Sequence, residues 1–103
     1  MDVQVRDNPA RSRYELVADD EVAGFVQYQL QGRHITMYHT EVDPAHEGAG
    51  LGGRLAHDAL ADVRARGLEV VPLCPFIAAY INEHQDEYLD LVVDEMKERV
   101  SHG

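Results

Sequence analysis

Apolar and polar residues alternate through roughly the first forty positions, a pattern typical of strands with one buried face. Two alternating segments, Arg13 to Ala18 and Val22 to Leu30, are separated by the acidic stretch Asp19 to Glu21, which predicts a β-hairpin. A third segment, Arg33 to Val42, follows a turn, and Val3 to Arg6 is expected to add an edge strand. The alternation in the third segment predicts one face with Ile35, Met37, His39 and Glu41, and another with Thr36, Tyr38, Thr40 and Val42.

The spacing of apolar residues changes from that of a strand to that of a helix after Pro44. Apolar residues three and four apart predict a helix from about Leu51 to Arg66, and Gly67 is a typical residue just past a helix end. The β-branched run Leu68 to Leu73 predicts a short strand in the interior of the sheet. Beyond it, Pro75 to His84 and Glu87 to Val100 predict two short helices or one bent helix. This order predicts an α+β fold with a mostly antiparallel sheet, and 103 residues suffice for a single domain, residues 1–103.

Composition narrows the possible partners. The net charge of −10, from 19 acidic and 9 basic residues, argues against nucleic acid and favours a partner with positive charge. No apolar run is long enough to cross a bilayer, and the N-terminus lacks the pattern of a secretory signal, so we expect a cytoplasmic protein without a membrane partner. A single cysteine, Cys74, excludes an internal disulfide, and the histidines lack metal-ligand spacing, so no metal is expected.

The segment His46 to Leu55 contains four glycines, Gly48, Gly50, Gly52 and Gly53, at the start of the predicted helix. Each glycine in a first helical turn lowers helix stability by roughly 1 kcal/mol relative to alanine. Four glycines so close together therefore indicate a role other than folding. Bare backbone and unpartnered N–H groups at a helix start bind anions, most often phosphates. The alternative is a flexible turn with a tight helix crossing. A P-loop is excluded because no Gly-Lys-Ser/Thr follows, and a dinucleotide fold is excluded because an antiparallel meander precedes the glycines.

These segments resemble the GNAT superfamily of acyl-CoA-dependent N-acyltransferases, whose Arg/Gln-x-x-Gly-x-Gly/Ala motif opens a helix after a long central strand. The combination of EVDPAHEGAGLGGRLAHDAL with VVPLCPFIAAYINEHQDEYLDLV is similar to the small, single-domain YjdJ-type branch, over about Tyr14 to Val93. The resemblance implies a GNAT fold with a splayed central strand pair. It also implies acetyl-CoA (coenzyme A) as a co-substrate.

The resemblance also assigns the cofactor-binding residues. Gly50 and Gly52 match the two motif glycines, and Tyr80 lies where the superfamily often has an acid tyrosine. Glu47 departs from the pattern, because it stands where the superfamily usually has Arg or Gln and a carboxylate there would repel phosphate. Arg54 is a candidate for the missing cation. The full set expected to bind the cofactor is Thr40, Val42, Glu47, Gly48, Ala49, Gly50, Leu51, Gly52, Gly53 and Tyr80, with an amide near Val42 polarising the thioester carbonyl.

Three residues are candidates for catalysis. His39 and Glu41, two apart on one strand face, would deprotonate an amine directly or through water, although a half-buried, hydrogen-bonded strand histidine is an equal alternative. Cys74 would protonate the departing CoA or accept the acetyl group, although a free cysteine is more often a small buried hydrophobe. Tyr80 has a similar alternative, because its spacing with neighbouring apolar residues also suits a core position.

Together these features predict an acetyl-CoA-dependent N-acetyltransferase. The acceptor would be a small amine or a lysine-containing molecule, since the acidic C-terminal region favours a cation. We expect a monomer or a weak dimer. The alternative is a domain of the same fold that binds acyl-CoA or a protein partner without turnover.

Overall fold

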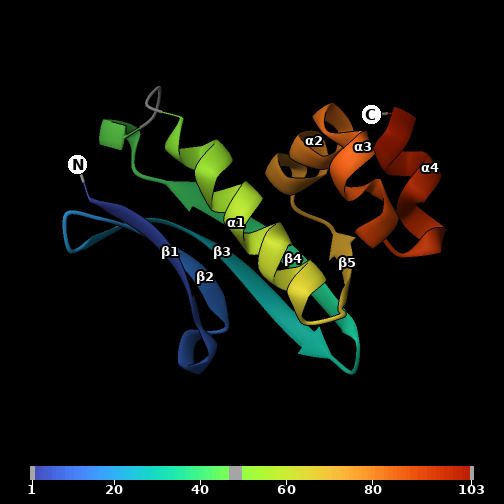
Figure 1. Ribbon diagram of the computed structural model, residues 1–103, viewed down its shortest axis with the longest axis horizontal. Coiled ribbons are helices and arrows are strands. Elements are labelled where there is room, and N and C mark those ends of the chain that lie inside the picture. The colour runs from blue at the N-terminus through green and yellow to red at the C-terminus, as the bar shows by residue number, and fades with distance from the viewer. Residues whose placement is uncertain (1, 47–49, 103) are drawn as a thin grey trace.

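The computed structural model describes residues 2–46 and 50–102. A sheet carries one long helix across one face, and the remaining helices gather beside its last strand (Figure 1). The strands are β1 (Val3–Asn8), β2 (Arg13–Ala18), β3 (Glu21–Gln31), β4 (His34–Val42) and β5 (Glu69–Pro72). The α-helices are α1 (Leu51–Ala65), α2 (Pro75–Glu83), α3 (Gln85–Tyr88) and α4 (Asp94–His102). Three short 3-10 helices are also described: η1 (Pro9–Arg11), η2 (Pro44–His46) and η3 (Leu89–Leu91).

The strand order is β1-β2-β3-β4-β5, with β1 to β4 pairing antiparallel and β4 pairing parallel to β5. The predicted α+β class and the mostly antiparallel sheet are therefore confirmed. The hairpin turn between β2 and β3 has Asp19 and Asp20 at φ 50° and 68°, the left-handed pair that suits the twist of a tight hairpin. Gly32, at φ 61°, makes the turn into β4.

Helix α1 supplies the main core. Its buried side chains are Leu51, Leu55, Ala56, Ala59, Leu60 and Val63, which recur at helical spacing and face the sheet. The chain leaves the helix at Gly67, whose φ of 68° is the left-handed conformation expected after a helix end. The helix prediction from about Leu51 to Arg66 is thus confirmed, with the regular part ending at Ala65.

Strand β5 is the last strand in the order, so the prediction that it lies in the sheet interior is wrong. Its residue Val70 is buried for another reason. The chain after η3 returns to its free edge, where Val70 forms an isolated parallel bridge with Val92 and the Val93 amide donates to the Val70 carbonyl at 3.1 Å. This extended return also explains why the C-terminal region forms α2, α3, η3 and α4, and neither two helices nor one bent helix.

A bulge in β4 changes which residues share a face. Gln27 of β3 pairs with His39 while Tyr28 pairs with Met37, so Tyr38 is the extra residue. Beyond Tyr38 the alternation is reversed, and His39 and Glu41 lie on the sheet face opposite α1, which we call the open face. The prediction that they share a face with Ile35 and Met37 is therefore wrong, because strict alternation does not survive an inserted residue.

Among the described residues, no helix is long and apolar enough to cross a membrane.

Candidate active site

The β4 and β5 strands separate after a short parallel ladder. Their last paired residues are Met37 and Pro72, and the Cys74 amide then donates to the Met37 carbonyl at 2.9 Å. Strand β4 continues to Val42 in register with β3, so within the described chain its last residues have no partner on the β5 side. The splayed central strand pair is therefore present. We call the space between the two strands the gap.

The exposed edge of β4 presents peptide groups to the gap. The Asp43 amide donates to the Ala23 carbonyl on β3 at 2.7 Å. Because peptide groups of an antiparallel strand alternate in direction, those of Thr40 and Val42 point away from β3 and toward the gap. No backbone acceptor for either amide is found among the described residues outside the strand ladder. These are the groups expected to contact the pantetheine arm and the thioester carbonyl.

Cys74 lies at the gap, where its Sγ is 3.0 Å from the Thr40 Oγ1. The cysteine is 3% exposed and occupies the N-cap position of α2, with Pro75 as the first helical residue. The bulge at Tyr38 places the Thr40 hydroxyl on this side of the sheet. Sequence reasoning assigned only the backbone of Thr40, and missed this side-chain contact because it depends on the bulge.

The backbone N–H groups at the start of α1 find few partners in the part of the chain that the structure describes. The first helical bond runs from the Arg54 amide to the Gly50 carbonyl at 3.1 Å, and the amides of Leu51, Gly52 and Gly53 have no acceptor among the described residues. Gly50 has a φ of 75° and no side-chain cap closes the helix start. Three other residues predicted to bind the cofactor, Glu47, Gly48 and Ala49, lie outside the described residues.

Gly52 brings the start of α1 to the gap. A Cβ built there would lie 3.1 Å from the Phe76 Cζ and 3.8 Å from the Val42 Cγ2, so the helix start, the end of β4 and the start of α2 meet at this point. Phe76 is 38% exposed and was not predicted as a site residue, because its spacing with Tyr80 reads as a core face. Its position directly after Cys74 and Pro75 is the signal that would have identified it.

Tyr80 lies on α2 next to the first turn of α1. A Cβ on Gly53 would lie 3.9 Å from its ring, and the ring stacks on His84 with a centroid distance of 4.2 Å. Burial raises the pKa of the Tyr80 hydroxyl above its usual range, with nearby acidic groups adding to the effect. Tyr80 therefore keeps its proton at neutral pH, as an acid must before it donates.

His39 and Glu41 form a hydrogen-bonded pair, with the His39 Nε2 2.8 Å from the Glu41 Oε2. This contact confirms the expectation that the two residues share one strand face, and their side chains are 48% and 63% exposed. If the neutral imidazole donates from Nε2, its Nδ1 carries the free lone pair that a general base needs. The pair and Cys74 lie on opposite sides of β4.

Arg54, the candidate for the missing phosphate-binding cation, forms a salt bridge within α1. Its Nε is 2.8 Å from the Asp58 Oδ2, one turn along α1, and a terminal nitrogen is 3.5 Å from the Val3 carbonyl. Asp58 also accepts from the His57 ring. Arg54 would have to leave this carboxylate to act as the phosphate-binding cation that the sequence suggests.

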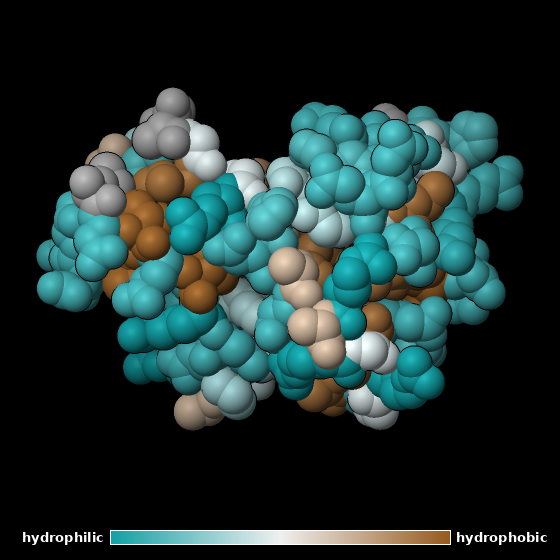
Figure 2. All heavy atoms as spheres, in the orientation of Figure 1, coloured by the Kyte–Doolittle hydropathy of each residue, from teal (hydrophilic) through white to brown (hydrophobic). Residues whose placement is uncertain are grey.

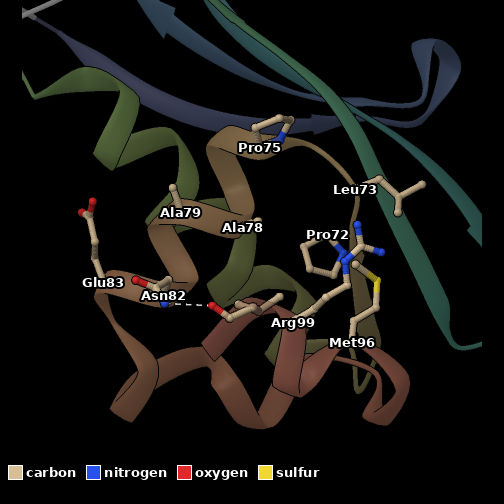
Figure 3. A pocket seen from close by; sticks show the side chains of 10 residues that line it. Pro72, Leu73, Pro75, Ala78, Ala79, Asn82, Glu83, Met96 and Arg99 are labelled. Atoms are coloured by element: carbon tan, nitrogen blue, oxygen red, sulfur yellow. Dashed lines mark hydrogen bonds between the residues drawn. The ribbon is translucent and has the colours of Figure 1, made fainter. Parts of the chain in front are cut away.

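A separate cavity of about 460 Å³ lies between the end of β5, α2 and α4. Figure 3 shows Pro72, Met96 and Arg99 around it, with Asn82 donating to the Val100 carbonyl at 2.8 Å. None of the residues predicted for acyl transfer lines it. We therefore place the candidate site at the gap, where Thr40 contacts Cys74 and Val42 lies next to Gly52.

Comparison with known proteins agrees with this geometry. The family model of GCN5-related N-acetyl-transferases matches residues 13–91. Among solved structures, a GCN5-like protein from Staphylococcus aureus is 20% identical with a TM-score of 0.63, and the match covers 87% of each chain. A GNAT-family protein from Desulfovibrio desulfuricans is 21% identical with a TM-score of 0.52, covering 73% of this chain and 52% of that one.

The ribosomal-protein-S18-alanine N-acetyltransferase from Escherichia coli is 23% identical with a TM-score of 0.55. The match covers 58% of this chain but only 39% of the enzyme, so the chain spans about two fifths of its length. No curated protein matches the chain. The structural likenesses establish the fold, and the family model establishes membership: the chain belongs to the GCN5-related N-acetyltransferase family.

Proposed function

We propose that the protein is an acetyl-CoA-dependent N-acetyltransferase that transfers the acetyl group to an amine. The observation that carries the proposal is the gap between β4 and β5, to which the Thr40 and Val42 amides of β4 point and which the start of α1 reaches at Gly52. The YjdJ-type branch and the cytoplasmic location stay predictions from the sequence.

Two sets of backbone groups would hold the co-substrate. The amides of Leu51, Gly52 and Gly53 would bind the diphosphate of acetyl-CoA, aided by the positive end of α1. The pantetheine arm would then lie along the unpaired edge of β4, with the Val42 amide donating to the thioester carbonyl. A donor fixed at that position stabilises the negative charge that develops on the oxygen during acyl transfer.

Direct transfer needs one base and one acid. His39 Nδ1, with Glu41 accepting from Nε2, would take a proton from the amine nitrogen as that nitrogen bonds to the thioester carbon. The carbon–sulfur bond then breaks, and the CoA sulfur takes a proton from Tyr80 or Cys74. The products are an N-acetyl amine and CoA with a free thiol.

A second route passes through Cys74. Its sulfur, after losing its proton to a base, would attack the thioester carbon and release CoA, leaving an acetyl-cysteine that the amine then attacks. Both acyl carriers are thioesters, so the exchange needs no further reactant. The Thr40 hydroxyl, 3.0 Å from the sulfur, supports this route by holding Sγ at the gap.

A domain that binds acyl-CoA without turnover is the second candidate. The observation in its favour is the salt bridge between Arg54 and Asp58. Arg54 is the candidate cation for the phosphates of the co-substrate, and in this salt bridge its charge is already paired with a carboxylate. An enzyme with weak co-substrate binding and a non-catalytic binder would share this feature.

The experiment measures acetyl-CoA binding by calorimetry and thiol release with a panel of amines. We expect binding, and thiol release that depends on the amine and falls strongly in His39→Ala. Binding without release would favour the non-catalytic candidate, and absence of binding would refute both. Cys74→Ala separates the routes, because it removes any acetyl group bound to the protein, which mass spectrometry detects, whereas direct transfer with Tyr80 as the acid continues.

A further inference from the structure

The open face has a depression of about 380 Å³ beside the His39 and Glu41 pair. Its floor is the backbone of Gly24 and Val42, where a Cβ on Gly24 would lie only 2.8 Å from the Glu41 carbonyl oxygen. A side chain at position 24 therefore does not fit without a shift of β4. The volume lies in the range of small-molecule sites, about 300 to 1,000 Å³.

One wall of the depression is apolar. A register shift in the β2 and β3 ladder pairs Leu16 with Gly24 but Val17 with Val22, which places Val22 on the open face. Val22 is 44% exposed, and the Phe25 ring lies nearby with a centroid distance of 6.1 Å to the His39 ring. This wall offers contact to methylene groups.

The opposite wall carries two carboxylates, Glu41 and Asp43. Glu41 bonds to His39, and the closest Asp43 oxygen is 3.8 Å from the His46 ring. Among the described residues, neither carboxylate forms an ion pair with a Lys or Arg side chain, so no permanent cation compensates their charges.

The cation at the depression is compensated. The Arg13 guanidinium lies 4.6 Å from the Phe25 ring centroid, and its Nε donates at 2.7 Å to Glu15, a buried carboxylate that also accepts from Arg6. The hydrogen bonds to Glu15 outweigh its burial and keep the pKa of this carboxyl below its usual range, so the pairing persists at neutral pH. The depression therefore combines an apolar wall with uncompensated negative charge.

We propose that this depression is the acceptor subsite and that it takes a short aliphatic diamine. The inference rests on the proposed function and names its acceptor. One nitrogen of the diamine, deprotonated by His39, attacks the thioester in the gap, and the second nitrogen stays an ammonium near Glu41 and Asp43. The methylene chain between them lies on Val22 and Phe25.

The test compares putrescine with n-butylamine, which has the same carbon chain but no second ammonium. We expect a KM about fivefold lower for putrescine, the size of effect that one exposed ion pair gives. Asp43→Asn should remove most of the preference for putrescine over butylamine. Val22→Lys, which adds a positive charge to the apolar wall, should raise the KM for putrescine further. Glu95→Gln, the same type of charge change on α4 away from the depression, is the matched control.

Two results would overturn the inference. If butylamine is acetylated and putrescine is no better, or if Asp43→Asn keeps the preference, the diamine subsite is wrong while the proposed function stands. If neither amine is acetylated, and putrescine leaves the amide resonances of Val22 to Phe25 unshifted although acetyl-CoA binds, both the subsite and amine transfer are refuted. A lysine peptide accepted in place of putrescine would also overturn the inference.

Discussion

At the scale of single residues, the bulge at Tyr38 decides the chemistry of β4. One inserted residue puts the Thr40 hydroxyl beside Cys74 and turns His39 and Glu41 to the open face. The proposed base, His39, and the Cys74 thiol thereby lie on opposite sides of β4. With regular alternation the histidine would point into the core beside Met37, where an imidazole would need a buried partner.

The contact between Thr40 and Cys74 gives a first prediction. If Cys74 carries the acetyl group, Thr40→Val should slow its labelling by acetyl-CoA roughly fivefold, since it removes one hydrogen bond of about 1 kcal/mol. Thr40→Ser keeps the hydroxyl and should restore the rate. Mass spectrometry of the intact protein over time measures the labelling. Wild-type labelling in Thr40→Val would show that the hydroxyl holds the sulfur for packing alone.

The glycines of α1 give a second prediction. Gly53→Asp should weaken acetyl-CoA binding by about tenfold or more, because a carboxylate in the first turn repels the diphosphate. The helix itself tolerates an acid there, since negative charge suits a helix start. Gly53→Ala is the matched control, because its Cβ would meet only the Tyr80 ring at an ordinary 3.9 Å. Gly50 is less suitable, since its φ of 75° strains any side chain. If calorimetry gives equal affinities for the two variants, the hypothesis that the α1 amides bind the diphosphate is refuted.

Local patterns identified most of the candidate site, and contacts across the fold identified the rest. Sequence spacing was enough to pair His39 with Glu41, because residues two apart share a strand face. It was not enough to bring Thr40 to Cys74 or Phe76 to Gly52, since these contacts join segments more than twenty residues apart. The reversal at Tyr38 is also invisible in the sequence, because no glycine or proline marks the bulge.

At the scale of elements, a polar cluster joins α1 to the meander strands. The Tyr14 hydroxyl on β2 donates to Asp62 of α1 at 2.5 Å, and Arg66 donates to the same hydroxyl at 3.3 Å and to Asp7 of β1 at 3.2 Å. The Tyr28 hydroxyl on β3 donates to Asp7 at 2.7 Å. The cluster therefore fixes how the helix crosses the sheet, and with it where the glycine turn meets β4.

Removing one bond of this cluster gives a third prediction. Tyr14→Phe should lower the free energy of unfolding by about 1 to 2 kcal/mol, because the buried ring loses its hydroxyl and Asp62 and Arg66 lose a shared partner. Urea denaturation measures the change. Tyr38→Phe is the control, since Tyr38 is 47% exposed and should change stability by less than about 0.5 kcal/mol. A Tyr14→Phe protein as stable as the control would show that the cluster contributes no net stability.

The same cluster predicts a loss of stability at high pH. Burial, together with the hydrogen bond to Asp7, raises the pKa of Tyr28 from its ordinary value of 10.0 to about 12. The folded state thus binds the proton more tightly than the unfolded state, so stability should fall as pH rises from about 10 to 12. Unfolding followed at several pH values tests this, and Tyr28→Phe should flatten part of the decline. A profile that is level over this window would contradict the prediction.

The elements themselves were predictable where their residues follow one period. Strands β2, β3 and β4 and helix α1 match their expected ranges within a residue or two. The C-terminal elements were not predictable, because Val92 and Val93 pair with β5 although their spacing suits a helix. Only the folded chain brings β5 next to them. The same pairing hides the edge position of β5, since it buries Val70, which would otherwise be exposed.

At the scale of the whole molecule, the negative net charge should act in opposite directions on the two proposed substrates, acetyl-CoA and a cationic amine. The chain carries a net charge of −10, and hydrophilic residues cover most of the face that α1 and the C-terminal helices form (Figure 2). Acetyl-CoA is itself an anion, so the field of the protein opposes its approach, and only short-range donors such as the α1 amides favour it. A cationic acceptor is attracted by the same field.

The two substrates should therefore respond oppositely to salt. Raising the ionic strength from about 0.01 M to 0.15 M shortens the Debye length from about 30 Å to 8 Å, which screens both the repulsion of acetyl-CoA and the attraction of a diamine. We expect the affinity for acetyl-CoA to stay level or to rise roughly twofold, whereas the KM for putrescine should rise by a similar factor and that for butylamine by less. Calorimetry measures the first quantity and thiol release the others. A strong loss of acetyl-CoA affinity with salt would mean that side-chain cations hold the diphosphate, and that Arg54 leaves Asp58 when the co-substrate binds.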